Sequence, residues 1–343
     1  MKVLNQENIK NSKVILQKKD KEIFHLLSHN VRIPISKLAK LLKMSRQSVE
    51  YRINVMKREH LIAGSRAVIN IKKLGFSSFH FFVNLSKESE KELINNCNKS
   101  KYVNALISYS GKYNYEISIM AQNPEEATQE FFTLINKLKV IDYFPSLLIK
   151  TITSKILPEV ESEKDLTIKN IKHDPSFQKD FIKKSDYKPD LIDLKICYLL
   201  SQNASLSLIE IGKNLRMTKD AISYRIKKLI SSNIILNFRP VIDFSVLNLK
   251  VQTVLIKSSN RDKESDKKFE NYLKNSNSVL WATELFSEFD YLIYVITEKQ
   301  EEIHAFVQDL REYFSDYIKT YEILFAYQEY KYSFMSEKII EKS

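Results

Sequence analysis

Two short runs of the chain are rich in side chains that donate or accept hydrogen bonds. One comprises Ser45, Arg46, Gln47, Ser48, Tyr51 and Arg52, and the other comprises Thr218, Lys219, Asp220, Ser223, Tyr224 and Arg225. Each run begins with a hydroxyl residue and interleaves with apolar residues at helical spacing, which predicts a capped helix with a polar outer face. Such donors and acceptors reach base edges when the helix N-terminus enters a major groove of DNA. A solvated helix face is the alternative interpretation.

The two runs belong to an internal repeat. Residues 38–75 align without a gap with residues 211–248, at an offset of 173 residues. The alignment pairs the run Tyr51-Arg52-Ile53 with Tyr224-Arg225-Ile226. A unit that recurs this far along the chain indicates a duplicated domain rather than a short solenoid repeat. The sequence therefore predicts two copies of one module.

Each copy predicts three helices and a strand. Asp20 and Asp193 are the expected N-caps of the first helices, and Pro34 and Ser207 begin the second helices, with Glu210 completing a capping box. Residues 67–69 and 240–242 are expected to form β-wings. Together these elements predict a winged helix-turn-helix in each copy.

After each winged domain the apolar period changes to two, and the order of predicted elements is βαββαβ, as in ferredoxin-like domains. The predicted fold class is α+β. The expected domains are winged helix-turn-helix domains at 18–75 and 190–247, ferredoxin-like domains at 76–157 and 248–328, a linker at 158–189 and a tail at 329–343.

Composition narrows the function classes. The net charge of +12 favours an anionic partner, of which nucleic acid is the commonest. The four glycines are scattered, which excludes a phosphate-binding P-loop and a dinucleotide fingerprint. The chain has only two cysteines, far apart, which favours a reducing compartment such as the cytoplasm. It lacks a long apolar run, so no membrane contact is expected. No catalytic residues and no cofactor are expected.

Other candidate residues favour structural roles. His25 and His29 stand four residues apart, a spacing that suits a metal, but a third ligand is lacking nearby and a surface pair is the favoured interpretation, so no metal site is expected. Cys97 is expected to be a partly buried helix residue, and Trp281 to pack in a sheet.

These features together resemble the Lrp/AsnC family of bacterial and archaeal transcription regulators. The residues that carry the resemblance are Asp20 and Asp193, the turn Asn30 to Ile33, Leu38-Ala39, the Met-Ser and Met-Thr helix starts, Arg52-Ile53, Arg225-Ile226, and the wing ending at Leu74-Gly75. The resemblance covers nearly all of the chain outside the linker and the ends. It implies a DNA-binding regulator whose ferredoxin-like sheets pair, here within one chain as a pseudo-dimer that can associate into a larger homo-oligomer.

The resemblance also implies a small effector, commonly an amino acid, at a hairpin in each ferredoxin-like domain. The matching segments are SGKYNYEISI at 110–119 and FSEFDYLIYV at 286–295. The first copy keeps Gly111 but has Asn114 where the family favours Asp, and the second keeps Asp290 but has Ser287 where the family favours Gly. Each copy thus has one residue of the expected pair.

An enzyme is the alternative function class. Siroheme decarboxylases are similar to this family in fold, and they occur as paired or fused units of this kind. They need basic and histidine residues along the porphyrin cleft, whereas the six histidines are scattered here. A third class, a helix-turn-helix used only for protein assembly, stays open at this point.

Overall fold

The computed structural model describes residues 15–157 and 187–341. These residues form two compact units, and each unit draws segments from both halves of the chain. The head unit comprises 15–76, 187–242 and 333–341, and the barrel unit comprises 77–157 and 243–332. The predicted linker lies outside the described residues as far as residue 186. In the described part, every helix is too short or too polar to cross a membrane.

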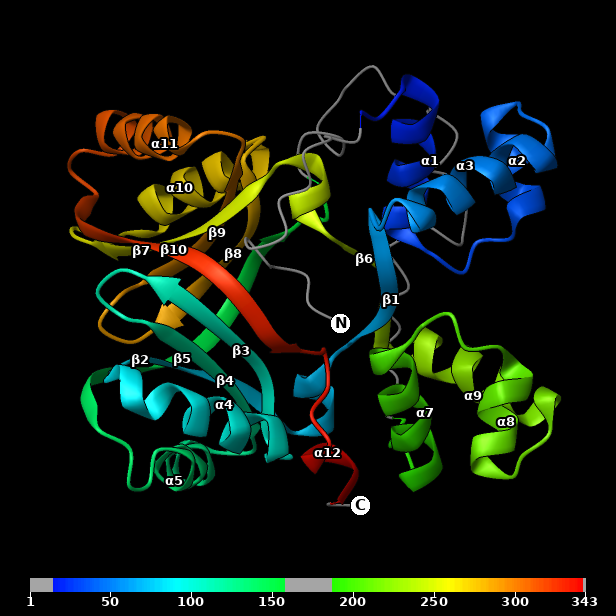
Figure 1. Cartoon of the computed structure of the whole chain (residues 1–343), viewed down its shortest axis with the longest axis horizontal. Helices are drawn as coiled ribbons and strands as arrows, with labels where there is room; N and C mark the ends of the chain where they lie inside the picture. Colours follow the sequence, from blue (N-terminus) through cyan, green and yellow to red (C-terminus); the bar gives the residue numbers. More distant parts are fainter. Residues whose placement is uncertain (1–14, 158–186, 342–343) are drawn as a thin grey trace. The chain divides into compact units, whose positions relative to one another are not determined.

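The head unit holds two three-helix domains, each followed by a strand (Figure 1). The first consists of α1 (Lys18–His29), α2 (Ile35–Leu42), α3 (Arg46–Arg58) and β1 (Ile62–Ile69), and a 3-10 turn, η2 (Ile71–Leu74), follows it. The second consists of α7 (Leu191–Gln202), α8 (Leu208–Leu215), α9 (Lys219–Ser231) and β6 (Ile235–Ile242). The winged helix-turn-helix order predicted from the repeat is thus confirmed.

The caps of the third helices are those that the sequence predicts. Ser45 Oγ accepts the N–H of Ser48 at 3.1 Å, and Thr218 Oγ1 accepts that of Ala221 at 3.3 Å. The expected caps of the first helices are wrong, because Gln17 and Asp190 occupy the cap positions. Asp20 and Asp193 are instead the third helical residues, whose carboxylates accept the backbone N–H of the cap in a capping box.

The strands predicted as separate wings pair with each other. β1 and β6 form a two-stranded antiparallel sheet in which Arg66 lies opposite Arg239 and Ala67 opposite Phe238. Backbone groups on these strands therefore find their hydrogen-bond partners in the other copy. The ladder joins the two heads into one unit.

The barrel unit contains both βαββαβ repeats. The first half has β2 (Ser77–Leu85), η3 (Lys87–Ser89), α4 (Glu90–Lys99), β3 (Val103–Ser110), β4 (Tyr115–Ala121), α5 (Pro124–Leu134) and β5 (Val140–Ser154). The second has η5 (Phe244–Leu247), β7 (Lys250–Ser258), α10 (Lys263–Asn275), β8 (Val279–Phe286), β9 (Tyr291–Thr297), α11 (Gln300–Tyr313) and β10 (Ile318–Tyr332). The ferredoxin-like order is confirmed in each half.

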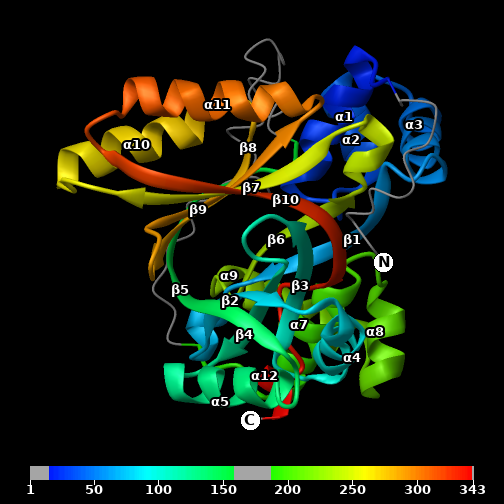
Figure 2. The same cartoon turned by 60° about the vertical axis from the view of Figure 1, so that its left-hand side comes forward.

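The eight strands close into one barrel in the order β10-β3-β4-β2-β5-β8-β9-β7. Within each half the strands follow the ferredoxin-like order, and the last strand of each half pairs with the second strand of the other. Helices α4 and α5 cover the outer face of the first half, and α10 and α11 cover that of the second (Figure 2). Each half has its own core between helices and strands, containing Cys97 and Phe131 in the first and Phe269 in the second.

One predicted boundary is wrong. Within the described residues, the segment expected to be a tail from residue 329 contains regular structure, because β10 extends to Tyr332 and a short helix α12 (Lys338–Glu341) then packs against α7. Its buried residues Met335 and Ile339 are too few to give a periodic signal. Helix α5 ends at Leu134, close to Lys137, whose φ of 66° is incompatible with a right-handed helix.

Candidate nucleic-acid interface

The candidate interface lies at the N-terminal ends of α3 and α9. The cap Ser45 and the first residues of α3, Arg46 and Gln47, are exposed, as are the cap Thr218 and the first residues of α9, Lys219 and Asp220. One turn further along, Tyr51 and Tyr224 keep 67% and 65% of their surface accessible. Ser48 and Ser223 are partly exposed on the same helices. A large aromatic residue this open at equivalent places of both copies is available for contact with a partner.

Arg52 and Arg225 do not share this exposure, because both are held by carboxylates of the first helix. Arg52 Nη1 donates to Asp20 Oδ1 at 2.7 Å. Arg225 Nη1 donates to Asp190 Oδ2 at 2.8 Å and to Asp193 Oδ1 at 2.9 Å, and these hydrogen bonds raise the pKa of Arg225. The two arginines therefore position the third helix against the first.

Two basic residues absent from the predicted set lie beside the interface. Lys43 and Arg216 are the C-caps of α2 and α8, and both are exposed. Both adopt left-handed backbone conformations, with φ of 52° and 55°. The recurrence of a basic residue at aligned positions just before the third helix is the sequence signal that identifies them.

Contacts between the heads extend beyond the β1–β6 ladder. Arg32 Nη1 donates to the carbonyl oxygens of Ala204 and Leu206, at 2.7 and 2.9 Å, and its guanidinium lies 5.5 Å from the ring centre of Phe238. Ser65 Oγ and Ser205 Oγ lie 2.7 Å apart. The two heads therefore interact through side chains as well as through the backbone hydrogen bonds of the ladder. These interactions favour a fixed distance between α3 and α9.

In the barrel unit, the predicted effector residues bind the protein itself. Asn114 Oδ1 accepts the N–H of Leu85 at 3.0 Å, and its Nδ2 donates to the carbonyl of Leu85 at 2.8 Å. Asp290 Oδ2 accepts the N–H and the hydroxyl of Ser258, both at 2.8 Å. Each residue fastens the hairpin to the end of the first strand in its half.

The remaining two effector candidates also have structural surroundings. Gly111 has a φ of 150°, which residues other than glycine rarely adopt, and a Cβ there would also lie 2.8 Å from the side chain of Leu324 and 3.3 Å from the carbonyl oxygen of Ile323 in β10, so the backbone conformation favours glycine there. Ser287 Oγ donates to the carbonyl of Phe289 at 2.8 Å. The structure thus accounts for both residues without a ligand.

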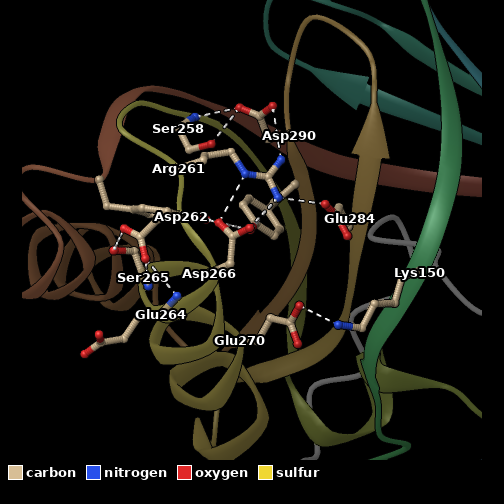
Figure 3. Close-up of polar contacts among 12 residues, drawn as sticks. Lys150, Ser258, Arg261, Asp262, Glu264, Ser265, Asp266, Glu270, Glu284 and Asp290 are labelled. Atoms are coloured by element: carbon tan, nitrogen blue, oxygen red, sulfur yellow. Dashed lines mark hydrogen bonds and ion pairs between the residues drawn. The ribbon is translucent and has the colours of Figure 1, made fainter.

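Arg261 lies at the centre of an ion-pair network beside Asp290 (Figure 3). Its guanidinium contacts Asp266 at 2.9 Å and Glu284 at 2.7 Å, and it lies 3.7 Å from Asp290. The hydrogen bond to Asp266 is the main cause that raises the pKa of Arg261. Positive charge from within the chain therefore already compensates the carboxylates around the second hairpin.

His25 and His29 do not form the open surface pair expected from the sequence. His25 is mostly buried, its ring centroid lies 4.8 Å from that of His29, and its Nδ1 has no hydrogen-bond partner among the described residues. Burial, and then repulsion from His29, lower the pKa of His25 to about 4. No set of three metal-binding side chains is found in the described part of the chain. Trp281 packs against Tyr294 in the sheet, as predicted.

Acidification is expected to destabilise the head unit through His25. An unfolded imidazole binds a proton near pH 6.5, whereas folded His25 binds one only at about 4, so the unfolded state holds more protons between these values. Stability is therefore lost as the pH falls through this window. Denaturant unfolding near pH 7 and near pH 5 measures the loss, which should be smaller in His25→Gln. Equal losses in parent and variant would refute this assignment.

Comparisons with known proteins match both heads. The model of the AsnC-type helix-turn-helix domain matches residues 16–57, and that of a winged helix-turn-helix DNA-binding domain matches residues 189–235. The chain is 26% identical over 138 residues to the HTH-type transcriptional regulator LrpA of Pyrococcus abyssi, covering 40% of this chain and 98% of that protein. It is 27% identical over 149 residues to LrpB of Bacillus subtilis, covering 43% and 98%. Each relative thus has the length of one half.

The tandem arrangement has a counterpart among solved structures. The crystal structure of the siroheme decarboxylase NirDL matches with a TM-score of 0.63 and 12% identity, over 95% of this chain and 98% of that one. At this identity the likeness shows the fold alone. The fold therefore agrees along nearly the whole chain, while the relatives found by sequence are regulators.

Proposed function

Since the chain is a tandem member of the Lrp/AsnC family, we propose that it is a sequence-specific transcription regulator that binds double-stranded DNA through two heads. The observation that carries the proposal is the pair of equivalent helices, α3 and α9, whose capped N-termini are exposed within one joined head unit. The proposed location is the cytoplasm, and the proposed action on DNA involves no catalysis.

The two heads are proposed to read different sequences. The aligned pairs Arg46 with Lys219 and Gln47 with Asp220 differ in chemistry. Gln pairs with adenine through two hydrogen bonds, whereas a carboxylate accepts from the amino group of cytosine. Arg and Lys both contact guanine or phosphate, but only Arg offers a planar fork. The operator should therefore consist of two unlike half-sites.

Replacement of Arg46 and Lys219 with alanine is expected to weaken DNA binding and reduce its salt dependence. Affinity falls as salt rises, and each phosphate contact that is lost makes the negative slope of log affinity against log salt less steep by about one unit, because fewer counterions are released. A base contact that is lost instead costs about 1–3 kcal/mol and relaxes specificity. Fluorescence anisotropy between about 50 and 200 mM salt measures both effects.

The matched control is Lys267→Ala on α10, which removes an exposed charge from the barrel unit. It changes the net charge without altering the proposed interface. If the double variant and the control bind with the same affinity and the same salt slope as the parent, then α3 and α9 do not carry the contact.

The barrel is proposed to be a pseudo-dimer that replaces the pairing of two separate chains. The pairing of β5 with β8 and of β10 with β3 supports this, because each half completes the sheet of the other. Light scattering of the intact chain tests the proposal, and a monomer is the expected building block. Association of pseudo-dimers into larger homo-oligomers would appear as whole-number multiples of this mass.

Amino-acid effector binding is proposed only for the second half. In the first half, Asn114 uses both its amide oxygen and its amide nitrogen on Leu85. In the second, Asp290 offers a carboxylate that an ammonium group could contact in competition with Lys257 and Arg261, at 3.8 and 3.7 Å. A thermal shift with single amino acids tests the proposal, and Asp290→Asn should abolish any shift.

A siroheme decarboxylase-like enzyme is the second candidate, favoured by the full-length likeness to NirDL. Its substrate would be an iron tetrapyrrole. An enzyme of this kind needs histidine residues along its porphyrin cleft. The buried imidazole of His80 does not offer a free nitrogen for that role, because one nitrogen contacts Glu116 and the other contacts Ser78 and Ser118. Titration with an iron porphyrin separates the candidates. Stoichiometric uptake with a shifted absorbance band would favour the enzyme, and an unchanged spectrum together with DNA binding would favour the regulator.

A further inference from the structure

A buried polar cluster lies inside the barrel unit, centred on the carboxylate of Glu116 in β4. Only 2% of the surface of Glu116 is exposed. Its oxygens accept from Tyr109 Oη at 2.5 Å and from Tyr294 Oη at 2.9 and 3.0 Å, and Oε1 lies 2.5 Å from His80 Nδ1. Burial of a carboxylate is costly unless hydrogen bonds and charge compensate it. Here three side chains do so.

The cluster continues into both halves of the chain. His80 Nε2 lies 3.1 Å from Ser118 Oγ, on the first half. Thr253 Oγ1, on the second half, donates to Tyr109 Oη at 3.1 Å. The hydroxyl of Tyr294 in the second half also donates to Glu116 in the first half. Hydrogen bonds of the cluster therefore cross between the halves at two places, from Tyr294 to Glu116 and from Thr253 to Tyr109. Burial, followed by the charge of Glu116, raises the pKa of both Tyr109 and Tyr294, so both hydroxyls stay protonated.

The cluster lies on the sheet face opposite the helices. Tyr115 and Ile117, the neighbours of Glu116 along β4, belong to the core beneath α4 and α5. Successive side chains of a strand point to opposite faces, so Glu116 points into the closed barrel. That is the side on which the two halves meet.

The two halves differ at every central position of the cluster. In the first half Phe82 pairs with Glu116, and the equivalent pair in the second half is Leu255 with Leu292. Likewise His80 pairs with Ser118, and Thr253 pairs with Tyr294. Glu116 thus corresponds to Leu292 and Ser118 to Tyr294. The cluster forms only when a first half meets a second half.

Like halves cannot reproduce these contacts. Two first halves would bury two Glu116 carboxylates in one barrel, and a serine would stand at each position where Tyr294 now donates. Two second halves would bury the hydroxyl of Tyr294 with leucine in place of its acceptor. A buried polar group without a partner, and a second buried charge of the same sign, both disfavour assembly.

We propose that the Glu116 cluster determines the pairing specificity of the barrel. It favours pairing of the first half with the second half and disfavours pairing of two identical halves. The partner that this surface fits is therefore the other βαββαβ repeat, not an identical repeat from another molecule. The inference rests on the barrel alone and stands whether or not the heads bind DNA.

The test is a refolding competition. A protease site is inserted between residues 158 and 186, and the purified full chain is cleaved, unfolded in urea and refolded with both fragments present. Native mass spectrometry then counts unlike pairs and like pairs. Because the heads also pair in this protein, the informative quantity is the change in the ratio between variants. The parent should refold almost entirely as unlike pairs.

Glu116→Leu should lower the ratio of unlike to like pairs by about tenfold to a hundredfold. It removes the buried charge from a pair of first halves, which stabilises that like pair. It also removes the acceptor of the Tyr294 hydroxyl, which destabilises the unlike pair. Tyr294→Phe, which removes one oxygen atom, should lower the ratio of unlike to like pairs as well. This variant tests the proposal if Glu116→Leu does not refold. The matched control is Tyr291→Phe on the same strand, whose hydroxyl bonds to Tyr317 outside the cluster. It should leave the ratio unchanged.

Two results would overturn the proposal. One is a parent that refolds with as many like pairs as unlike pairs. The other is a ratio that is the same in Tyr294→Phe, Tyr291→Phe and the parent, which would show that the cluster contributes no more to pairing than any buried hydroxyl.

Discussion

Insertion of five base pairs between the two half-sites of the operator is expected to weaken binding by about a hundredfold or more. Five base pairs rotate one half-site by about half a turn, so the second recognition helix no longer faces its groove. The loss of two base contacts at about 1–3 kcal/mol each accounts for this factor. The expectation follows from the β1–β6 ladder and the hydrogen bonds of Arg32, which join the heads.

An insertion of ten base pairs is the informative control. It restores the facing of the half-sites but moves them apart by about one DNA turn, roughly 34 Å. Heads on a flexible tether would tolerate this change, whereas joined heads lose the second half-site in both operators. Gel-shift titrations of the three operators decide between the two. Full affinity for the ten-base-pair insertion would show that the heads separate on DNA.

Replacement of Arg225 with alanine is expected to lower the free energy of unfolding of the head unit by about 2–3 kcal/mol. The carboxylate of Asp193 is fully buried, and Arg225 is its cationic partner. Breaking a fully buried pair costs about 3–5 kcal/mol, because the remaining charge is uncompensated. The expected value is smaller because the side chain of Arg225 is 22% exposed and solvent screens part of the interaction.

The matched variant is Arg52→Ala in the first head. Its partner Asp20 keeps 16% of its side chain exposed, so the loss should be smaller than for Arg225→Ala. Denaturant unfolding measures both. A loss no greater for Arg225→Ala than for the surface variant Lys219→Ala would contradict the positioning role.

The elements of both halves were predictable because each has a local sequence signal. Apolar periods of helices and strands, together with the hydroxyl caps Ser45 and Thr218, predict the order that the structure shows. The duplication strengthened these predictions, since a pattern found twice is less subject to chance. Strand partners have no such signal. That β1 pairs with β6, and β5 with β8, depends on contacts between residues far apart in the sequence.

The candidate site was predictable only in part. The exposed residues Arg46 and Lys219 follow from helical spacing, which places them on the outer face. The same spacing does not reveal that Arg52 and Arg225 meet carboxylates of another helix, because that contact depends on how the helices pack. The Glu116 cluster was not predictable from the sequence for the same reason, because its members come from five strands that are distributed over both halves of the chain.

The most direct test of two unlike DNA-reading heads is selection of binding sites from random double-stranded DNA by the intact protein, with the enriched pool sequenced. The expected result is a pair of different half-sites at one fixed spacing. In Asp220→Gln, whose side chain matches Gln47 of the first head, only the half-site read by α9 should change. A pool without an enriched sequence, or a perfect palindrome, would contradict the account.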